Sequence, residues 1–292
     1  YAFIIWDEHA QSLFAARDVY GIKPLYYMDD GERVVFASRL KALATGLRLS
    51  DEWPQDSKDA FLMLGSVYEP GTVIRDIFLL PAGHLMRVDG SGVMLEQYAS
   101  IGKQLLRTDR KSTDHLPTIV KNAVIESVKR HLVSDVPVGL LLSSGIDSAA
   151  VASVMAERSN ACVTAITIVY GEGSDGTDES VLARKLADRL GFQHVVRNVS
   201  KQEFLADLPL ILKMMDQPSI DGINIWFAAK AVKEQGLKVV LSGVGGDELF
   251  GGYPWLYYRA TVCDDFEHYI DQYYKYWQRL IDNRNLKKIF AP

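Results

Sequence analysis

Between residues 138 and 148 the chain reads Val138-Gly139-Leu140-Leu141-Leu142-Ser143-Ser144-Gly145-Ile146-Asp147-Ser148. The apolar run, the small polar residues and the Ala/Val/Met-rich segment that follows predict a buried strand over 136–142, a tight loop and a helix over 148–158. Such a loop directs backbone N–H groups, hydroxyls and the positive end of a helix toward one point, which suits phosphate or pyrophosphate. The loop lacks the lysine of GxxxxGK[ST]. The alternative is a simply capped helix, with Asp147 and Ser148 as cap residues and Gly145 turning the chain.

A second loop, which is rich in glycine, follows the apolar run 237–242. It reads Ser242-Gly243-Val244-Gly245-Gly246-Asp247-Glu248-Leu249-Phe250-Gly251-Gly252-Tyr253. Glycines let a backbone approach a ligand where a Cβ would collide, and a carboxylate beside them can hold Mg²⁺ against phosphate oxygens. Alone, this loop would be interpreted as an ordinary turn with a solvated acidic pair. Together with the first loop it indicates a nucleotide site.

Strands and helices alternate from about residue 115 onward. Apolar runs predict strands over 136–142, 163–169, 194–199 and 237–242, and helical periodicity predicts helices over 116–131, 148–158, 178–190 and 221–235. Unbroken apolar strands between helices are typical of a parallel sheet covered on both faces. Because open α/β sheets bind ligands at the carboxyl ends of their strands, the loops after Leu142, Val169 and Leu241 are the candidate site.

The first hundred residues carry a different pattern. Short apolar runs are separated by polar or glycine-containing turns, at 1–6, 12–16, 34–37, 72–77, 84–88 and 93–98. This pattern predicts β structure with antiparallel hairpins. Residues 107–114 have no periodicity and would serve as a linker. We therefore predict an α/β protein with a β-rich domain over 1–100, a linker over 101–114 and a parallel-sheet domain over 115–292.

Composition limits the classes of function. The 292 residues have a formal net charge of -5 and two cysteines, Cys162 and Cys263. Scattered lysines and arginines give no electrostatic reason to expect nucleic-acid or membrane binding, and the apolar runs are shorter than the roughly 20 residues that span a bilayer. Two cysteines in no disulfide or zinc spacing favour a reducing cytoplasm. The chain begins at Tyr1 inside a predicted strand, so we expect a missing N-terminal part.

The two loops together resemble the signatures SGGxDS and SGEGxDE followed by LxGGY, which mark the synthetase half of the glutamine-dependent asparagine synthetases, an ATP-pyrophosphatase family. Five further segments are similar to the last third of that family's glutaminase domain: Phe3-Ile4-Ile5-Trp6-Asp7, Gly21-Ile22-Lys23-Pro24-Leu25-Tyr26-Tyr27, Phe36-Ala37-Ser38, Glu69-Pro70-Gly71 and Leu80-Pro81-Ala82-Gly83-His84. The resemblance therefore extends over nearly the whole chain. It implies part of an N-terminal-nucleophile-type glutaminase domain, followed by a Rossmann-like ATP-pyrophosphatase domain that is incomplete at its C-terminus.

The resemblance implies a two-step ligation. A substrate carboxylate attacks the α-phosphate of ATP, pyrophosphate leaves, and ammonia derived from glutamine captures the acyl-adenylate; the lead reaction makes asparagine from aspartate. The implied cofactors are ATP and Mg²⁺. The implied partners are small-molecule substrates, with no nucleic acid and no membrane, and a homodimer is left open. Stabilising the leaving pyrophosphate electrostatically contributes several kcal/mol in such reactions.

The resemblance also assigns roles to residues of the two loops. The implied catalytic residues are Ser143, Gly145, Asp147, Ser148, Asp247 and Glu248. The implied nucleotide-binding residues are Leu142, Ser143, Ser144, Gly145, Asp147, Ser148, Ile168, Ser242 and Gly243, and the implied metal ligands are Asp147 and Asp247. Two further segments, Asp178-Glu179-Ser180 and Asp216-Gln217-Pro218, resemble family positions near the active site, although a helix cap is an equal alternative for Asp178.

Three departures from the family pattern bear on the prediction. Ser144 replaces a glycine, which would cost about 1–2 kcal/mol if that position needs positive φ. Val244 replaces an acidic residue and can neither take up a proton nor fix an amine. Neither cysteine lies where the family has its glutaminase nucleophile, so this chain alone should not hydrolyse glutamine. The alternatives are a relative that amidates or cyclises another carboxylate, in β-lactam, peptide or sugar biosynthesis, and a nucleotide-binding protein without catalysis.

Overall fold

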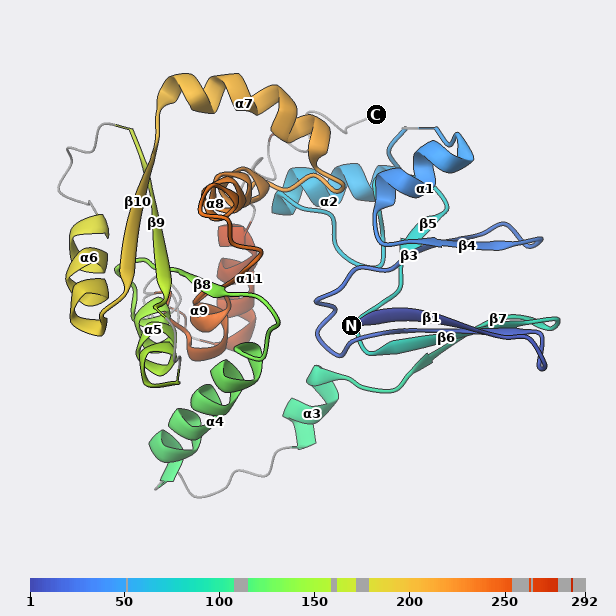
Figure 1. Ribbon diagram of the computed structural model, residues 1–292. Coiled ribbons are helices and arrows are strands. Elements are labelled where there is room, and N and C mark those ends of the chain that lie inside the picture. Colours follow the sequence, from blue (N-terminus) through green and yellow to red (C-terminus); the bar gives the residue numbers. More distant parts are fainter. Residues whose placement is uncertain are drawn as a thin grey trace. The chain divides into compact units, whose positions relative to one another are not determined.

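The computed structural model describes residues 1–50, 52–107, 115–158, 162–171, 179–253, 263, 265–277 and 285, without the side chains of 105–107 and 273–277 (Figure 1). Backbone contacts divide the chain into two compact units. Unit 1 contains Tyr1–Lys111, Met214–Ile220 and Tyr274–Pro292, and unit 2 contains Ser112–Lys213 and Asp221–Tyr273. Within the described ranges, no helix combines the length and the apolar character that crossing a membrane requires.

Unit 1 is built on two antiparallel sheets, with strand orders β1-β2-β6-β7 and β4-β3-β5. The strands are β1 (Ala2–Asp7), β2 (Ser12–Arg17), β3 (Tyr26–Asp29), β4 (Val34–Ala37), β5 (Ile77–Leu79), β6 (His84–Asp89) and β7 (Gly92–Gln97). The helices are α1 (Leu40–Leu47), α2 (Gln55–Leu64) and α3 (Ile101–Arg107). The prediction of antiparallel pairing in this part of the chain is confirmed.

The predicted strand over 72–77 is wrong. Residues 72–76 form a loop, and only Ile77 enters β5. The cause is the buried Thr72 hydroxyl, which donates to the carbonyl oxygens of Ile74 at 2.9 Å and Ile77 at 2.8 Å and accepts the N–H of Ile74 at 3.1 Å. A side chain that bonds its own backbone in this way competes with strand pairing. In addition, α3 occupies the first half of the segment that was predicted as a linker.

Helices α1 and α2 were not predicted. Leu40, Leu43 and Leu47 do recur at helical spacing, so the signal for α1 was present in the sequence. The start of α1 was not visible there, because its cap comes from far along the chain. The Asp216 carboxylate accepts the N–H of Leu40 at 3.0 Å and that of Lys41 at 3.5 Å, which satisfies backbone donors that every helix start leaves open.

Unit 2 is built on a parallel sheet of four strands in the order β10-β9-β8-β11. The strands are β8 (Val138–Leu141), β9 (Thr164–Tyr170), β10 (Gln193–Val199) and β11 (Val239–Leu241). The helices that follow or connect them are α4 (Leu116–His131), α5 (Ile146–Arg158), α6 (Glu179–Leu190), α7 (Lys201–Met214), α8 (Gly222–Glu234), α9 (Gly246–Phe250) and α11 (Phe266–Trp277), although the last residue of α7 and residues 274–277 of α11 fall in unit 1. The predicted parallel sheet is confirmed. Helix α7 was missed, since Pro209 interrupts its helical pattern.

Helices cover both faces of this sheet. On one face, buried residues of α4, α5 and α6 pack against Leu140 and Ala165. On the other face, Ala231 and Val232 of α8 pack against Ile166. Alternate residues of β8 and β9 therefore point to opposite hydrophobic layers, which explains why these strands read as unbroken apolar runs. Both layers leave the carboxyl ends of the strands open for the loops that carry the site.

Candidate active site

The first loop connects β8 to α5, and hydrogen bonds between Ser143 and Ser148 hold its two ends together. The Oγ atoms of Ser143 and Ser148 lie 2.9 Å apart, and the Ser143 N–H donates to Ser148 Oγ at 3.2 Å. The Gly145 N–H donates to Ser143 Oγ at 3.2 Å. Because α5 begins at Ile146, Asp147 and Ser148 lie inside its first turn and are not the cap residues of the alternative interpretation. Ser144 does not adopt positive φ, so the backbone penalty considered for this position does not arise.

The second loop runs from β11 into α9 and touches the first loop backbone to backbone. A Cβ added to Gly243 would lie 2.5 Å from the backbone nitrogen of Ser148 and 2.8 Å from the carbonyl carbon of Asp147. A Cβ added to Gly246 would collide with the Asp147 carboxyl group, including Oδ2 at 2.5 Å. Real Cβ contacts are longer than this, so a larger residue at Gly243 or Gly246 would displace Asp147 or the backbone beside it. The glycines of the second loop therefore bring the two acidic residues, Asp147 and Asp247, to the same place.

Among the residues that the structure describes, no salt bridge joins Asp147, Asp247 or Glu248 to a basic side chain. Burial raises the pKa of Asp147 above its ordinary value, and the negative charges of Asp247 and then Glu248 raise it further. Glu248 is exposed, and its carboxylate accepts a hydrogen bond from the Tyr253 hydroxyl at 2.5 Å. The raised pKa of Asp147 indicates that the site favours bound positive charge.

A magnesium ion fits Asp147 and Asp247 only if other ligands contribute. In the part of the chain that the structure describes, no group of three or more His, Cys, Asp or Glu residues is arranged to hold a metal ion. Mg²⁺ typically keeps several waters and binds through one or two carboxylates together with substrate phosphates, at short and strict distances. Two facing carboxylates beside a phosphate-type loop match this pattern.

The two loops line a pocket of about 1000 Å³ at the carboxyl ends of the sheet. All but one of the eleven residues predicted for the site line it: Leu142, Ser143, Ser144, Gly145, Asp147, Ser148, Ile168, Ser242, Gly243 and Asp247. Glu248 is the exception. Leu142, Ile166 and Ile168 give the pocket an apolar wall where β8 and β9 end, and the two loops contribute the carboxylates of Asp147 and Asp247 and most of the hydroxyl groups. The pocket therefore has an apolar part and a charged part, which suits a nucleotide base and its phosphates.

Several residues that line the pocket could not be identified from the sequence patterns. Tyr170 ends β9, and its hydroxyl donates to Asn224 Oδ1 of α8 at 3.0 Å. Ile225 and Ala228 of α8 also line the pocket. These residues lie inside ordinary apolar or helical patterns. The polar Asn224 near the start of the α8 segment was the one available signal, and its partner is 54 residues away in the sequence.

The two further segments that resembled family positions near the active site have different locations. Glu179 lines the pocket, whereas Asp178 lies outside the described residues. Asp216 and Gln217 do not line the pocket. They cluster with unit 1, where Asp216 caps α1 and Gln217 accepts the N–H of Val73 at 3.0 Å and donates to the Gly71 carbonyl at 3.2 Å.

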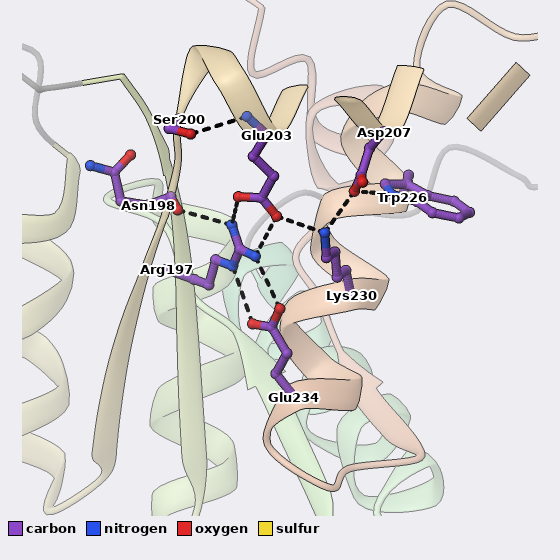
Figure 2. A network of polar contacts seen from close by, with 8 residues as sticks. All are labelled: Arg197, Asn198, Ser200, Glu203, Asp207, Trp226, Lys230 and Glu234. Carbon is purple, nitrogen blue, oxygen red and sulfur yellow. Dashed lines mark hydrogen bonds and ion pairs between the residues drawn. The ribbon is translucent and has the colours of Figure 1, made fainter. Parts of the chain in front are cut away.

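A network of ion pairs joins β10 and α7 to α8, the helix that contributes lining residues to the pocket (Figure 2). Arg197 donates all five of its N–H groups: to Glu203 at 2.5 and 2.6 Å, to Glu234 at 3.1 and 3.0 Å, and to the Asn198 carbonyl at 2.9 Å. The Arg197 side chain is 16% exposed. A partly buried guanidinium with every donor used is a rigid connection between the strand and the two helices.

Lys230 extends this network along α8. Its Nζ lies 2.7 Å from Glu203 Oε1 and 2.7 Å from Asp207 Oδ2, which also accepts the Trp226 indole N–H at 3.1 Å. Trp226, Lys230 and Glu234 are spaced four residues apart and share one face of α8 (Figure 2). The pocket-lining Asn224, Ile225 and Ala228 lie on the other face. The network therefore fixes the helix that presents these residues to the pocket.

Replacing Arg197 by lysine should destabilise unit 2 by about 1–3 kcal/mol, because a single ammonium cannot bond Glu203 and Glu234 in the same bidentate way. Arg197 first, and then Lys230, lower the pKa of Glu203 from 4.5 to about 2. A carboxylate with a lowered pKa stabilises the fold above its unfolded pKa, and the contribution is lost as the pH falls from about 4.5 toward 2. Urea unfolding of both proteins at about pH 7 and about pH 3 checks this. If the free energies of unfolding of the two proteins differed equally at both pH values, the ion pairs of Arg197 with the ionised carboxylates would not be what stabilises unit 2.

Comparisons with known proteins agree with this architecture. A family model described as "Asparagine synthase" matches residues 120–291, and one described as "Glutamine amidotransferase domain" matches residues 1–99. Asparagine synthetase [glutamine-hydrolyzing] 1 of Bacillus subtilis is 34% identical over 91% of this chain and 41% of its own length. A putative asparagine synthetase of Mycobacterium tuberculosis is 32% identical over 87% of this chain and 39% of its own. Amidase chry2 of Gibberella zeae is 32% identical over 92% and 41%.

These matches define the class of protein. A β-rich segment that matches the glutamine amidotransferase model precedes a parallel α/β unit that matches the asparagine synthase model and carries two loops at its strand ends. The chain belongs to the asparagine synthase family. The resemblance drawn from the sequence is therefore confirmed, and the chain spans about 40% of the length of the curated relatives that it matches.

Proposed function

We propose that the full-length protein is an ATP-dependent carbon–nitrogen ligase that activates a carboxylate as its adenylate and joins it to ammonia from glutamine. The observation that carries the proposal is the pair of carboxylates, Asp147 and Asp247, held together by glycines beside a serine-rich loop at the end of β8. The family supports ATP as the energy source. The amidotransferase match over residues 1–99 supports glutamine as the source of ammonia.

In the first step, a substrate carboxylate oxygen bonds to the α-phosphorus of ATP, and the bond from that phosphorus to the pyrophosphate oxygen breaks. The first loop would bind the departing pyrophosphate through its backbone N–H groups and the hydroxyls of Ser143 and Ser148. Leu142 and Ile168 would contact the adenine base from the apolar wall. Bound Mg²⁺ would neutralise the developing charge on the pyrophosphate, and Asp147 and Asp247 are the residues that would hold it.

In the second step, the nitrogen of ammonia bonds to the acyl carbon, AMP leaves, and the nitrogen loses a proton. The cysteines Cys162 and Cys263 both lie beyond the segment that matches the amidotransferase model, so neither is proposed as the glutaminase nucleophile. Aspartate is the lead substrate, because most of the relatives named above are called asparagine synthetases. Asparagine would then be the product.

A second candidate reaction uses a different carboxylate. Val244 lines the pocket with its side chain 87% exposed, at the position where the resemblance expects an acidic residue. An exposed valine offers an apolar contact and cannot bind an amine through charge. One similar protein is named an amidase and not an asparagine synthetase. This observation favours an acceptor with an apolar portion as the alternative to aspartate.

Pyrophosphate release by the full-length protein tests the proposal. With Mg²⁺, ATP, ammonia and a panel of carboxylates, release should depend on one of the carboxylates, and Asp247→Asn should reduce the rate by about 100-fold or more since the metal loses a charged ligand. Glu157→Gln on the exposed part of α5 removes the same charge away from the pocket and should leave the rate unchanged. If no carboxylate stimulates release, the ligase proposal is wrong. Release with another carboxylate and none with aspartate would favour the second candidate.

A further inference from the structure

A chain of hydrogen bonds crosses the sheet from the half-buried His194 to the start of the first loop. His194 of β10 lies with Nε2 2.8 Å from Oγ1 of Thr167 in the neighbouring strand β9. The Thr167 hydroxyl donates to the carbonyl oxygen of Leu142 at 2.7 Å. Leu142 is the last residue before Ser143, and its own N–H donates to the Ile166 carbonyl at 2.8 Å. This chain of hydrogen bonds therefore ends at Leu142, the residue from which the phosphate-type loop leaves the sheet.

The direction of these bonds fixes the protonation state of the histidine. A threonine hydroxyl has one proton, and Leu142 receives it, so Thr167 must accept the hydrogen of His194 Nε2. His194 Nδ1 is then unprotonated. Among the described residues, this buried atom has no hydrogen-bond partner. A proton placed there would have no acceptor, which agrees with the lowered pKa of His194, caused first by burial and then by Arg184 of α6, with Asp188 acting in the opposite direction.

We propose that His194 and Thr167 are positioning residues for the loop of Ser143 to Ser148. Thr167 is 3% exposed, and its carbonyl partner Leu142 is 2% exposed, so water cannot replace the lost partner if the chain is broken. The Leu142 carbonyl would then turn toward another donor and change the direction in which Ser143 leaves β8. A shift of about 1 Å at such a position can reduce activity by about 100-fold. The role of the loop rests on the proposed function, whereas the hydrogen-bond chain does not.

Variants of His194 can distinguish a positioning role from direct contact with a ligand. Thr167 lines the pocket, so a Thr167 variant alone could act on the ligand directly, but His194 is not among the lining residues. Any effect of His194 on the loop must pass through Thr167. Replacing His194 by methionine removes the donor, while glutamine can place an amide N–H close to the original Nε2–H. Thr164→Val provides the matched control, since it removes a hydroxyl from the opposite end of the same strand.

The first readout is calorimetric binding of Mg²⁺-pyrophosphate to the full-length protein, which requires no turnover. Thr167→Val and His194→Met should each weaken binding about 10-fold, the double variant should be no weaker than the weaker single variant, and His194→Gln and Thr164→Val should bind like the wild type. Additive effects, or variants that lose only thermal stability with unchanged binding, would overturn the proposal. Failure of pyrophosphate binding in the wild type itself would refute the loop's proposed function and, with it, the positioning role.

The second readout tests the hydrogen-bond chain without any ligand or assay of function. In full-length protein labelled with ¹⁵N-histidine, His194 is identified as the resonance lost in His194→Gln, among the six histidines of this sequence. Nε2 should be protonated and Nδ1 unprotonated at neutral pH, and the pKa of the ring should lie below the ordinary histidine value. A protonated Nδ1, or titration near the ordinary histidine pKa, would overturn the assignment. In that case Thr167 could not be fixed in the orientation that the proposal requires.

Discussion

Replacing Gly246 by alanine should remove activity while leaving the protein folded. The added Cβ would collide with the carboxyl group of Asp147, which can rotate away, and would lie 2.8 Å from the Asp147 Cβ, which moves only together with the start of α5. The fold can therefore accommodate the methyl group only if the Asp147 carboxylate turns away and the Asp147 backbone shifts slightly, which moves a proposed metal ligand out of place. We expect kcat/KM for pyrophosphate release to fall by about 100-fold or more, with a small change in melting temperature.

Two glycine variants serve as comparisons. A Cβ at Gly243 would meet the backbone of Asp147 and Ser148, which cannot rotate away, so Gly243→Ala should reduce stability as well as activity. Gly46→Ala in α1 adds a methyl group to a glycine that has open space around it and no positive φ, and it should change neither. If Gly246→Ala retained full activity, Asp147 would not be held where the account requires it.

Replacing Asp147 by asparagine should change stability and function in opposite directions. Because burial and the negative charges of Asp247 and Glu248 raise the pKa of Asp147, the folded protein holds its proton more tightly than the unfolded chain does. The ionised carboxylate therefore destabilises the metal-free fold, and this penalty grows as the pH rises through the folded pKa. The neutral asparagine removes it, so the metal-free variant should melt at a higher temperature near neutral pH. Each kcal/mol gained corresponds to about 2–4 °C in a domain of this size.

Mg²⁺ with ATP should make the wild type melt at a higher temperature than Asp147→Asn, which reverses their metal-free order. With Mg²⁺ and ATP present, the wild type gains stability by binding, whereas Asp147→Asn should gain little and should lose pyrophosphate release by about 100-fold or more. Glu157→Gln, which removes a carboxylate further along α5, should behave like the wild type in both conditions. Thermal unfolding with and without Mg²⁺-ATP checks this. A metal-free Asp147→Asn protein less stable than the wild type would show that Asp147 has a structural role instead.

The loops of the site could be predicted from the sequence because their chemistry is local. Serines, glycines and aspartates directly after apolar runs mark strand ends, and the ends of neighbouring parallel strands lie at one edge of a sheet. Ser143, Asp147, Ser242 and Asp247 accordingly line one pocket. The orientation of Glu248 could not be predicted in the same way, because Asp247 and Glu248 are adjacent in the short helix α9 and adjacent helical side chains point in different directions. Its carboxylate bonds to Tyr253 and does not line the pocket.

The contributions that were missed depend on contacts between distant residues. Thr167 and His194 sit in β-strands whose apolar pattern says nothing of a hydrogen bond across the sheet. Asn224 becomes part of the pocket through packing of α8 and its bond from Tyr170. Asp216 resembled an active-site position, but its carboxylate caps α1, a helix 176 residues earlier in the chain. Periodicity identifies elements and their faces, whereas partners this far apart in sequence are fixed by the fold.

The measurement that tests the central claim most directly is the destination of a labelled carboxylate oxygen. The full-length protein is given Mg²⁺, ATP, ammonia and the active carboxylate carrying ¹⁸O in its carboxyl group, and the phosphorus products are analysed by mass spectrometry. Attack on the α-phosphorus predicts one ¹⁸O atom in each AMP and none in the pyrophosphate. Label in inorganic phosphate, with ADP as the second product, would mean attack on the γ-phosphorus. That result would contradict the account of the site as an adenylating centre.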